Sequence, residues 1–156
     1  LGLPGEGLAE AAHTLERMRE MAPESLTVHT LAIKRASRLN EQLEDYPLPS
    51  PANMEQMLRL SRETAAALGM RPYYMYRQKN MVGSYENVGY ARPGLESPYN
   101  ILIMEESQTI YAAGCGAVTK VVTPERIDRV FNVKSLEDYM GRIDEMIARK
   151  RDFFGR

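Results

Sequence analysis

The chain has a single cysteine, Cys115, and no tryptophan among its 156 residues. One cysteine cannot form a disulfide within the chain or supply a metal site made of cysteines alone. The 20 basic and 21 acidic residues leave a formal net charge of −1, which gives no general attraction to nucleic acid or to membranes. No apolar run reaches the roughly 18 residues of a spanning helix, and the first residues lack the features of a signal peptide. These absences favour a reducing, cytoplasmic setting.

The composition that remains, 44% hydrophobic and 26% charged, is that of an ordinary globular protein. The sequence begins with LGLPGEG, which is typical of a strand end followed by a tight loop. Because a natural protein would rarely begin there, we expect the chain to be a piece of a longer one.

The N-terminal third predicts a helix and then a strand. Apolar residues recur at helical spacing over 8–21, and Pro23 ends the pattern. The run over 25–33 is nearly continuously apolar and rich in β-forming residues, as in a strand buried on both faces. Loop, helix and buried strand in this order predict the end of a βαβ unit and therefore a parallel sheet. A short helix is expected over 35–43.

The rest of the chain predicts helices around an antiparallel sheet. Prolines over 46–51 mark a linker, and Ser50 can cap a helix that reaches Leu68. A final helix over 135–154 begins after its capping residue, Ser135. Because no long helices separate the predicted strands, we expect them to pair antiparallel. These strands cover residues 71–78, 100–105 and 110–122.

The loop at Gly2, Leu3 and Pro4 is the first candidate for a ligand contact. Small, flexible residues let the backbone approach a ligand closely. At the carboxyl end of a parallel strand, such a loop lies where ligands bind. Taken alone, a purely structural turn is the simpler interpretation.

Tyrosines gather between residues 73 and 100, within and on both sides of a polar stretch that we expect to connect two strands. Their flat faces, beside basic and amide side chains, suit a flat ligand with acid groups, or stacked nucleobases. A long connection ordered by its own tyrosines is an equal alternative. Arg92 has no evident structural duty there, because Pro93 and Gly94 already specify a turn.

Cysteine and histidine form no catalytic constellation in the sequence. Cys115 lies in a run of small residues over 112–117, which predicts a closely packed strand and a buried, unreactive thiol. His29 is expected in the core and His13 on a solvent-facing helix surface. Neither has an acidic partner at ligand spacing, so we expect no metal site.

Taken in order, the motifs resemble the oxygen-independent coproporphyrinogen III oxidase-like family of radical S-adenosylmethionine (SAM) proteins. GLPG at 2–5 resembles the stretch after the fifth barrel strand, and 25–32 resembles the sixth strand. The likeness is greatest to the HemZ-type branch, described as coproporphyrinogen dehydrogenase, and it covers essentially the whole chain. The motifs that carry this branch likeness are RQKNM at 77–81, YEN at 85–87 and YNILIME at 99–105.

The resemblance implies an α/β fold that is the C-terminal part of a larger enzyme. Residues 1–45 would be the last helix and strand of a partial (β/α)6 barrel. Residues 46–156 would be an α+β domain with a small antiparallel sheet and flanking helices. The intact enzyme would use SAM and a [4Fe–4S] cluster to convert coproporphyrinogen III into protoporphyrinogen IX, a step of porphyrin and haem biosynthesis. Three cysteines hold that cluster in the family, so this chain is expected to be inactive alone.

The resemblance also implies which residues meet each ligand. SAM would contact Gly2, Leu3, Pro4 and Ala32. The tetrapyrrole substrate carries carboxylates that arginine and other polar side chains suit. On that chemistry, the expected substrate residues are Tyr76, Arg77, Asn80, Tyr85, Asn87, Arg92 and Asn100.

Two other functions remain open. One is a haem or tetrapyrrole carrier of the same family without oxidase activity. The other is an RNA-binding module that uses the tyrosines, against which the near-neutral charge counts. We expect no nucleic-acid partner and no membrane span. The strand over 25–33 would have an unpaired barrel edge, which invites self-association.

Overall fold

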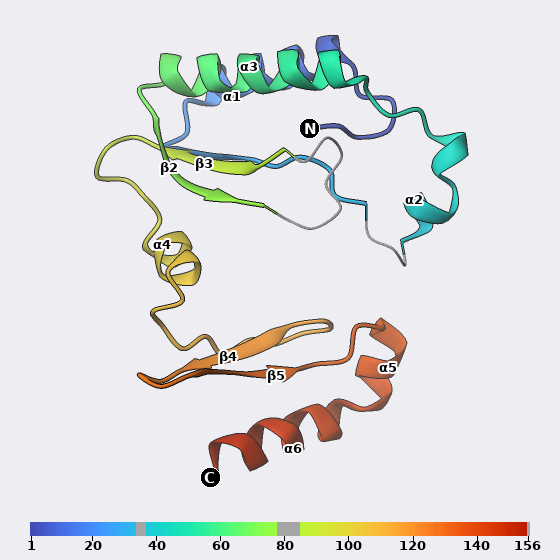
Figure 1. The fold of residues 1–156 in the computed structure, drawn as a ribbon, viewed down its shortest axis with the longest axis vertical. Helices are drawn as coiled ribbons and strands as arrows, with labels where there is room; N and C mark the ends of the chain where they lie inside the picture. The colour runs from blue at the N-terminus through green and yellow to red at the C-terminus, as the bar shows by residue number, and fades with distance from the viewer. Residues whose placement is uncertain (34–36, 78–84, 156) are drawn as a thin grey trace. The chain divides into compact units, whose positions relative to one another are not determined.

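The computed structural model describes residues 1–33, 37–77 and 85–155. Its contacts divide the chain into two compact units, Leu1–Ile101 and Leu102–Arg156, which we call the N-terminal and the C-terminal unit. Each unit combines helices with a small antiparallel sheet (Figure 1), so the mixed α/β character and the antiparallel pairing are confirmed.

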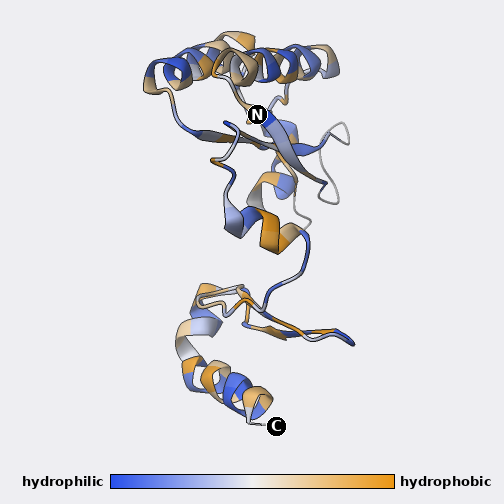
Figure 2. Ribbon diagram, turned by 90° about the vertical axis from the view of Figure 1, so that its left-hand side faces the viewer, coloured by the Kyte–Doolittle hydropathy of each residue, from blue (hydrophilic) through white to orange (hydrophobic). Residues whose placement is uncertain are grey.

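The two long helices predicted for the N-terminal unit are confirmed. Helix α1 (Leu8–Met21) begins where the Glu10 carboxylate accepts a hydrogen bond from the backbone N–H of Gly7 at 2.8 Å. Helix α3 (Pro51–Ala67) begins where the Ser50 hydroxyl accepts a backbone hydrogen bond, with proline at the first helical position. The two helices contact each other on one side of the sheet, and Figure 2 shows hydrophobic and hydrophilic residues interspersed along both.

The N-terminal sheet has three strands in the order β1-β3-β2, and both pairings are antiparallel. A strand forms in the segment 25–33, but the expectation that it is buried on both faces of a parallel sheet is wrong. It ends at Val28, pairs antiparallel with β3 and buries only Val28 fully, because polar side chains alternate with apolar ones along it. The strands are β1 (Ser25–Val28), β2 (Arg71–Tyr76) and β3 (Asn87–Ala91).

Strand β3 lies inside the polar stretch for which a connecting loop is predicted. Asn87 and Gly89 are unfavourable strand residues and hide the pattern. Each has a specific place in the structure. The side chain of Asn87 accepts a hydrogen bond from the backbone N–H of Thr30 at 2.9 Å, and the Tyr74 ring lies against Gly89. A Cβ at Gly89 would come within 1.9 Å of that ring, so the sheet needs glycine at this position.

Two clusters form the hydrophobic core of the N-terminal unit. Complete burial of a large apolar side chain is worth about 1.5–3 kcal/mol, so these clusters are its main stabilising feature. One cluster joins α3 to the sheet and contains Val28, Ala65, Met70 and Tyr90. The other joins α1 to α3 and contains Ala11, Met54 and Met57.

Short helical turns connect β1 to α3. The helix predicted over 35–43 is found in part, as α2 (Arg38–Glu41), and a 3-10 turn, η1 (Leu43–Asp45), follows it. The domain boundary expected after Asp45 concerns the barrel of a longer protein. The division of contacts after Ile101 does not test that boundary, which stays a prediction.

Helix α4 (Pro98–Met104) occupies the segment for which a strand over 100–105 is predicted, so that prediction is wrong. A short, continuous apolar run fits a buried strand or a helix equally well, and periodicity cannot separate them. The residues at the start of this apolar run favour a helix. The Ser97 hydroxyl accepts from the N–H of Asn100 at 3.4 Å, and Pro98 suits a first helical turn.

The sheet of the C-terminal unit is a hairpin of β4 (Val118–Val122) and β5 (Ile127–Phe131). The strand predicted over 110–122 therefore forms only in its last part. Gly114 and Gly116 adopt left-handed φ angles of 103° and 70° and turn the chain before β4. The run of small residues is a turn and not a closely packed strand.

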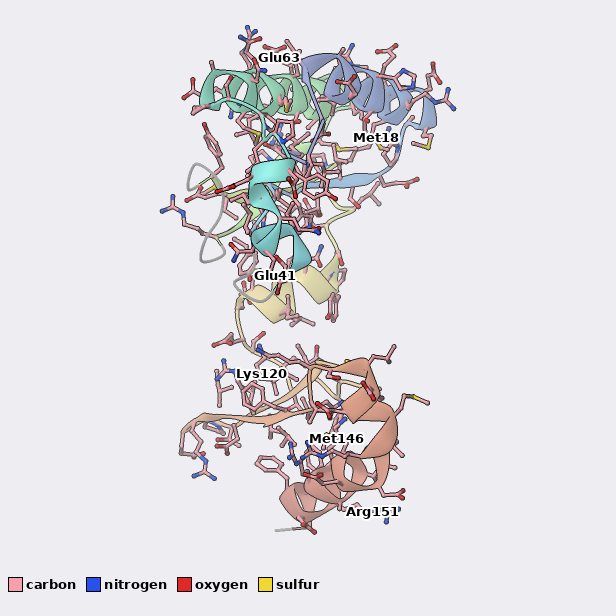
Figure 3. The ribbon with its side chains drawn as sticks, turned by 90° about the vertical axis from the view of Figure 1, so that its right-hand side faces the viewer. Met18, Glu41, Glu63, Lys120, Met146 and Arg151 are labelled. Carbon is pink, nitrogen blue, oxygen red and sulfur yellow. The ribbon has the colours of Figure 1, made fainter. Side chains whose placement is uncertain are left out.

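The predicted closing helix is divided into α5 (Leu136–Gly141) and α6 (Ile143–Phe154). Ser135 caps the first of them as predicted, because its hydroxyl accepts from the N–H of Asp138. The chain leaves the helical conformation at Arg142, directly after a glycine. Figure 3 labels Met146 of α6 and Lys120 of β4, which are 2% and 8% exposed.

Candidate functional site

The N-terminal loop is held by a carboxylate of its own. One oxygen of Glu6 accepts hydrogen bonds from the backbone N–H groups of Gly2 and Leu3, at 2.6 and 3.0 Å. Gly2 has a φ of +87°, and a Cβ there would lie 3.2 Å from the sulfur of Met54. The loop therefore requires glycine at this position both for its conformation and for its packing. Leu3 remains 55% exposed.

The same loop lies beside the segment that follows β1. The amino group of Leu1 donates to the carbonyl of His29 at 2.6 Å, and the N–H of Leu31 donates to the carbonyl of Leu1 at 2.9 Å. Leu1 thus forms backbone hydrogen bonds with both neighbours of Thr30, His29 and Leu31, which is the pattern of parallel strands. Ala32 follows Leu31 directly, so the structure brings the four expected SAM residues into one region.

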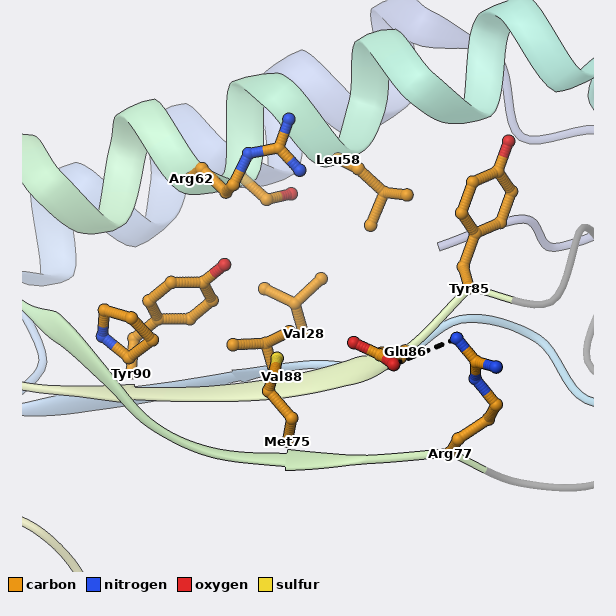
Figure 4. Close-up of a pocket in the computed structure, with 11 residues that line it drawn as sticks. Val28, Leu58, Arg62, Met75, Arg77, Tyr85, Glu86, Val88 and Tyr90 are labelled. Carbon is orange, nitrogen blue, oxygen red and sulfur yellow. Dashed lines mark hydrogen bonds and ion pairs between the residues drawn. The ribbon is translucent and has the colours of Figure 1, made fainter.

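A cavity of about 430 Å³ lies between α3 and the sheet. Figure 4 shows its floor, formed by Val28, Val88 and Met75, and Leu58 pointing down from α3. Volumes of this size are typical of small-molecule pockets with mostly apolar walls. Tyr85, Tyr90, Arg62, Arg77 and Glu86 add polar groups to the lining.

Two of the charged residues at this cavity pair with each other, and one does not. A guanidinium nitrogen of Arg77 donates to the carboxylate of Glu86 at 2.9 Å, which balances the one acid among the described residues of the lining. Within the described residues, the guanidinium of Arg62 makes no hydrogen bond or ion pair (Figure 4). Burial raises the pKa of the Tyr90 hydroxyl, and the positive charge of Arg62 opposes that rise.

Arg62 and Tyr90 are not among the site residues that the sequence predicts. A signal for Arg62 exists, because this exposed residue stands one helical turn after Leu58, at the edge of the buried stripe of α3. A charged residue at that position can reach the opening of a cavity below the helix. Tyr90 gives no comparable signal, since its strand is hidden by polar neighbours.

The structure divides the expected substrate residues among different places. Arg77 and Tyr85 line the cavity below α3. Tyr76, the last residue of β2, is 40% exposed. It directly precedes Arg77, and successive residues of an extended chain point to opposite faces of the sheet. Asn80 lies outside the described residues. These residues are therefore not gathered into one pocket.

The remaining expected substrate residues are engaged in internal hydrogen bonds. Asn87 is 1% exposed and holds the backbone of Thr30. The side-chain amide of Asn100 donates to the hydroxyl of Tyr73 at 2.8 Å. A ligand would have to replace these bonds to use either amide, while their part in substrate binding stays a prediction.

Arg92 has a structural role that the sequence did not suggest. Its Nε donates to the carbonyl of Leu68 at 3.1 Å, and a terminal nitrogen donates to the carbonyl of Ala22 at 3.4 Å. Both carbonyls belong to the residues that end α3 and α1, where the helix dipole favours a cation. The expectation that Arg92 lacks a structural duty is therefore wrong.

Two further expectations from single residues are wrong. Cys115 is exposed and not buried, because it lies in the turn between two left-handed glycines; its thiol donates to the carbonyl of Lys134. His29 is exposed and not in the core, because β1 ends before it. In residues 1–33, 37–77 and 85–155, no three histidine, cysteine or acidic side chains gather as a metal ion requires. No helix in those ranges is long and apolar enough to cross a membrane.

The fold and these groups describe a mixed α/β chain with a glycine-proline loop beside a parallel pairing and an apolar cavity with an unpaired cation. No protein-family model matches the chain, and no solved structure matches it significantly. Over 152 residues, or 96% of its length, the chain is 43% identical to the oxygen-independent coproporphyrinogen-III oxidase-like protein HemZ of Bacillus subtilis (strain 168). The resemblance inferred from the motifs is confirmed. The chain spans 30% of the length of that relative.

Proposed function

We propose that this chain is part of a radical SAM enzyme that converts coproporphyrinogen III into protoporphyrinogen IX by oxidative decarboxylation. The observation that carries the proposal is the 43% identity, over nearly the whole chain, to a protein named coproporphyrinogen-III oxidase-like. The paired bonds between Leu1 and the residues around Thr30 support a preceding strand parallel to β1, as a partial barrel requires.

In this proposal, the N-terminal loop forms one wall of the SAM site. The amides of Gly2 and Leu3 are occupied by Glu6, so they are not free to donate to a ligand. The exposed side chain of Leu3 and the small residues Pro4 and Ala32 remain for contact with the adenosine part. SAM, when bound, supplies the group that abstracts hydrogen from the substrate. The residues of this chain bind and orient it.

The iron–sulfur cluster does not fit the residues of this chain. Such a cluster is held by several cysteine thiolates, and Cys115 is the single cysteine here. It lies in the C-terminal unit, whereas the loop near Gly2 lies in the N-terminal unit. The cluster ligands must therefore come from elsewhere in the whole protein, and the chain alone should be inactive.

Substrate contact falls to the residues that are both polar and accessible. Tyr76 and Arg77 are exposed at the end of β2, and Tyr85 is half-buried nearby in the lining of the cavity. A ligand at the end of β2 could meet Tyr76 and Arg77 although they point to opposite faces. Arginine suits the propionate groups of a tetrapyrrole because it can bind a carboxylate with two parallel hydrogen bonds.

The test uses the full-length protein under anaerobic conditions with a reconstituted cluster, a reductant, SAM and coproporphyrinogen III. We expect SAM-dependent release of carbon dioxide and formation of protoporphyrinogen IX, and none from the 156-residue chain alone. A protein that binds haem stoichiometrically but releases no carbon dioxide would be a tetrapyrrole carrier and would contradict the proposal.

A further inference from the structure

The cavity between α3 and the sheet combines three features that a small-molecule site needs. It has an apolar floor, a volume of about 430 Å³, and polar groups at its two ends: Arg62 and Tyr90 at one, and Tyr85, Glu86 and Arg77 at the other (Figure 4). It lies on the face of the sheet that α3 covers, and its lining comes from α3 and from the three strands and their ends. The expected SAM residues lie instead in the loop at Gly2 and at Ala32. The cavity is thus a separate place in the N-terminal unit.

The end of the cavity at Arg62 and Tyr90 is suited to an anion. The guanidinium of Arg62 has no partner within the described residues, and the one acid of the lining, Glu86, is paired with Arg77. The lining therefore carries one positive charge in excess. Tyr90 is 7% exposed, and its hydroxyl makes no hydrogen bond among the described residues although it can donate one.

We propose that this cavity binds a small amphipathic carboxylate, with its carboxylate on Arg62 and Tyr90 and its apolar body over Val28 and Val88. The guanidinium and the hydroxyl would each donate to the carboxylate oxygens. The apolar body would lie between α3 and the sheet, with Leu58 and Met75 beside it. The cavity shares Arg77 and Tyr85 with the residues proposed to meet the tetrapyrrole, but the two groups proposed to hold the carboxylate, Arg62 and Tyr90, are not among those residues.

The arrangement also explains why an uncharged ligand would bind less well. An apolar molecule without an anion would cover the floor but leave the guanidinium of Arg62 and the Tyr90 hydroxyl without a new partner. A carboxylate satisfies both groups, and a hydrogen bond to a charged group is stronger than one between neutral groups.

The test is a titration of the 156-residue chain, with methyl-labelled methionine, leucine and valine, followed by NMR. The probes are octanoate and its uncharged counterpart octanol, both below the concentration at which they aggregate. We expect saturable shifts of the Val28, Val88 and Met75 methyl signals with octanoate, and at least about tenfold weaker binding of octanol.

Three variants locate the carboxylate. Arg62→Gln should weaken octanoate binding by about ten- to a hundredfold and leave octanol binding unchanged, while Tyr90→Phe should weaken octanoate binding by about three- to tenfold. Arg59→Gln is the matched control, because Arg59 is an exposed arginine of the same helix and does not line this cavity. Its octanoate affinity should equal that of the unaltered chain.

Unchanged methyl signals far from the cavity show that each variant is folded. The proposal is overturned if octanol binds as tightly as octanoate, if Arg59→Gln weakens binding as much as Arg62→Gln, or if the shifts never saturate. None of these outcomes depends on SAM, on a cluster or on a tetrapyrrole, so the proposed oxidase function stands or falls separately.

Discussion

The two units of the chain are stabilised in different ways. The N-terminal unit buries two apolar clusters between α1, α3 and the sheet. In the C-terminal unit, Met146 is the one fully buried hydrophobic residue among those described, and three buried residues are polar: Thr119, Lys120 and Asn132. Several large apolar side chains of that unit, such as Leu136 and Met140, are more than half exposed.

Hydrogen bonds and ion pairs replace the missing core in the C-terminal unit. The side-chain amide of Asn132 donates to the carbonyl of Gly114 at 2.7 Å. Glu106 accepts from Arg129 at 2.9 Å and lies 3.5 Å from the ammonium of Lys120. Such bonds contribute about 0.5–1.5 kcal/mol each, less than a buried large side chain. The unit that holds the candidate sites is therefore also the one with the larger buried apolar core.

The largest effect that separates the units should come from Met54→Ala. Met54 is completely buried between α1 and α3 and touches the loop at Gly2, so its truncation leaves a cavity. We expect a loss of about 2–5 kcal/mol in the free energy of unfolding of the N-terminal unit. Met140→Ala is the control, because Met140 is 70% exposed and its loss should cost less than about 0.5 kcal/mol.

Residue-resolved hydrogen exchange under native conditions measures both variants, because it reports each unit separately. Equal losses of unfolding free energy for Met54→Ala and Met140→Ala would mean that the exposed Met140 stabilises the C-terminal unit as much as the buried Met54 stabilises the N-terminal unit. The contrast between the two units would then be false.

Gly89→Ala is expected to cost about 1–3 kcal/mol in the N-terminal unit. The new Cβ would collide with the Tyr74 ring and push it off β3. Gly141→Ala is the matched change in the C-terminal unit, where no atom lies within 4 Å of the new Cβ. Because alanine is the better helix former, that change should be neutral or stabilising by up to about 1 kcal/mol. Thermal unfolding of both variants tests this, and a stable Gly89→Ala chain would disprove the close packing of Tyr74.

Arg92→Ala should reduce the stability of the N-terminal unit by about 1–2 kcal/mol in the absence of any ligand. The reason is the loss of the bonds to Leu68 and Ala22 at the ends of α3 and α1. Arg92→Lys keeps the charge but not the fork, so it should recover part of the loss. Urea denaturation of the three chains is the measurement. Identical urea midpoints for the three chains would contradict a structural role of Arg92 and leave substrate contact as its proposed role.

The smallest effect concerns pH in the C-terminal unit. Hydrogen bonds from Arg142, and then from Arg149, lower the pKa of Glu145 from 4.5 to about 2. Because the pKa is lower in the folded chain, the stabilisation is complete above about pH 4.5 and is lost as the pH falls toward 2. Glu145 is on the surface, so the change should be slight. A carbon-detected NMR titration should give the low pKa, and the stability of Glu145→Gln should depend less on pH over this window.

The sequence predicts the elements that have local signals and misses those that depend on distant partners. The caps at Ser50 and Ser135 and the stripe of α3 are local, and the structure has them as predicted. Strand β3 depends on Tyr74 and Thr30, which lie far from it in the chain, and no local pattern reveals it. The apolar run of α4 has no period that separates a helix from a strand.

For the candidate sites too, the sequence does not reveal groups that lie far apart in the chain. The loop at Gly2 and the residue Ala32 could be paired through the family resemblance, and the structure places them side by side. The cavity below α3 arises where three strands and a helix meet. Its key groups, Arg62 and Tyr90, are 28 positions apart in the sequence, which is too far for a spacing argument.

The most direct test of the account is hydrogen exchange of the full-length protein with and without coproporphyrinogen III, under anaerobic conditions and with SAM present. We expect that substrate slows exchange in the N-terminal unit, at the end of β2 around Tyr76 and Arg77 and at Tyr85. The C-terminal unit should exchange at the same rate in both samples. Slower exchange confined to residues 102–156, with no change at β2, would contradict the account.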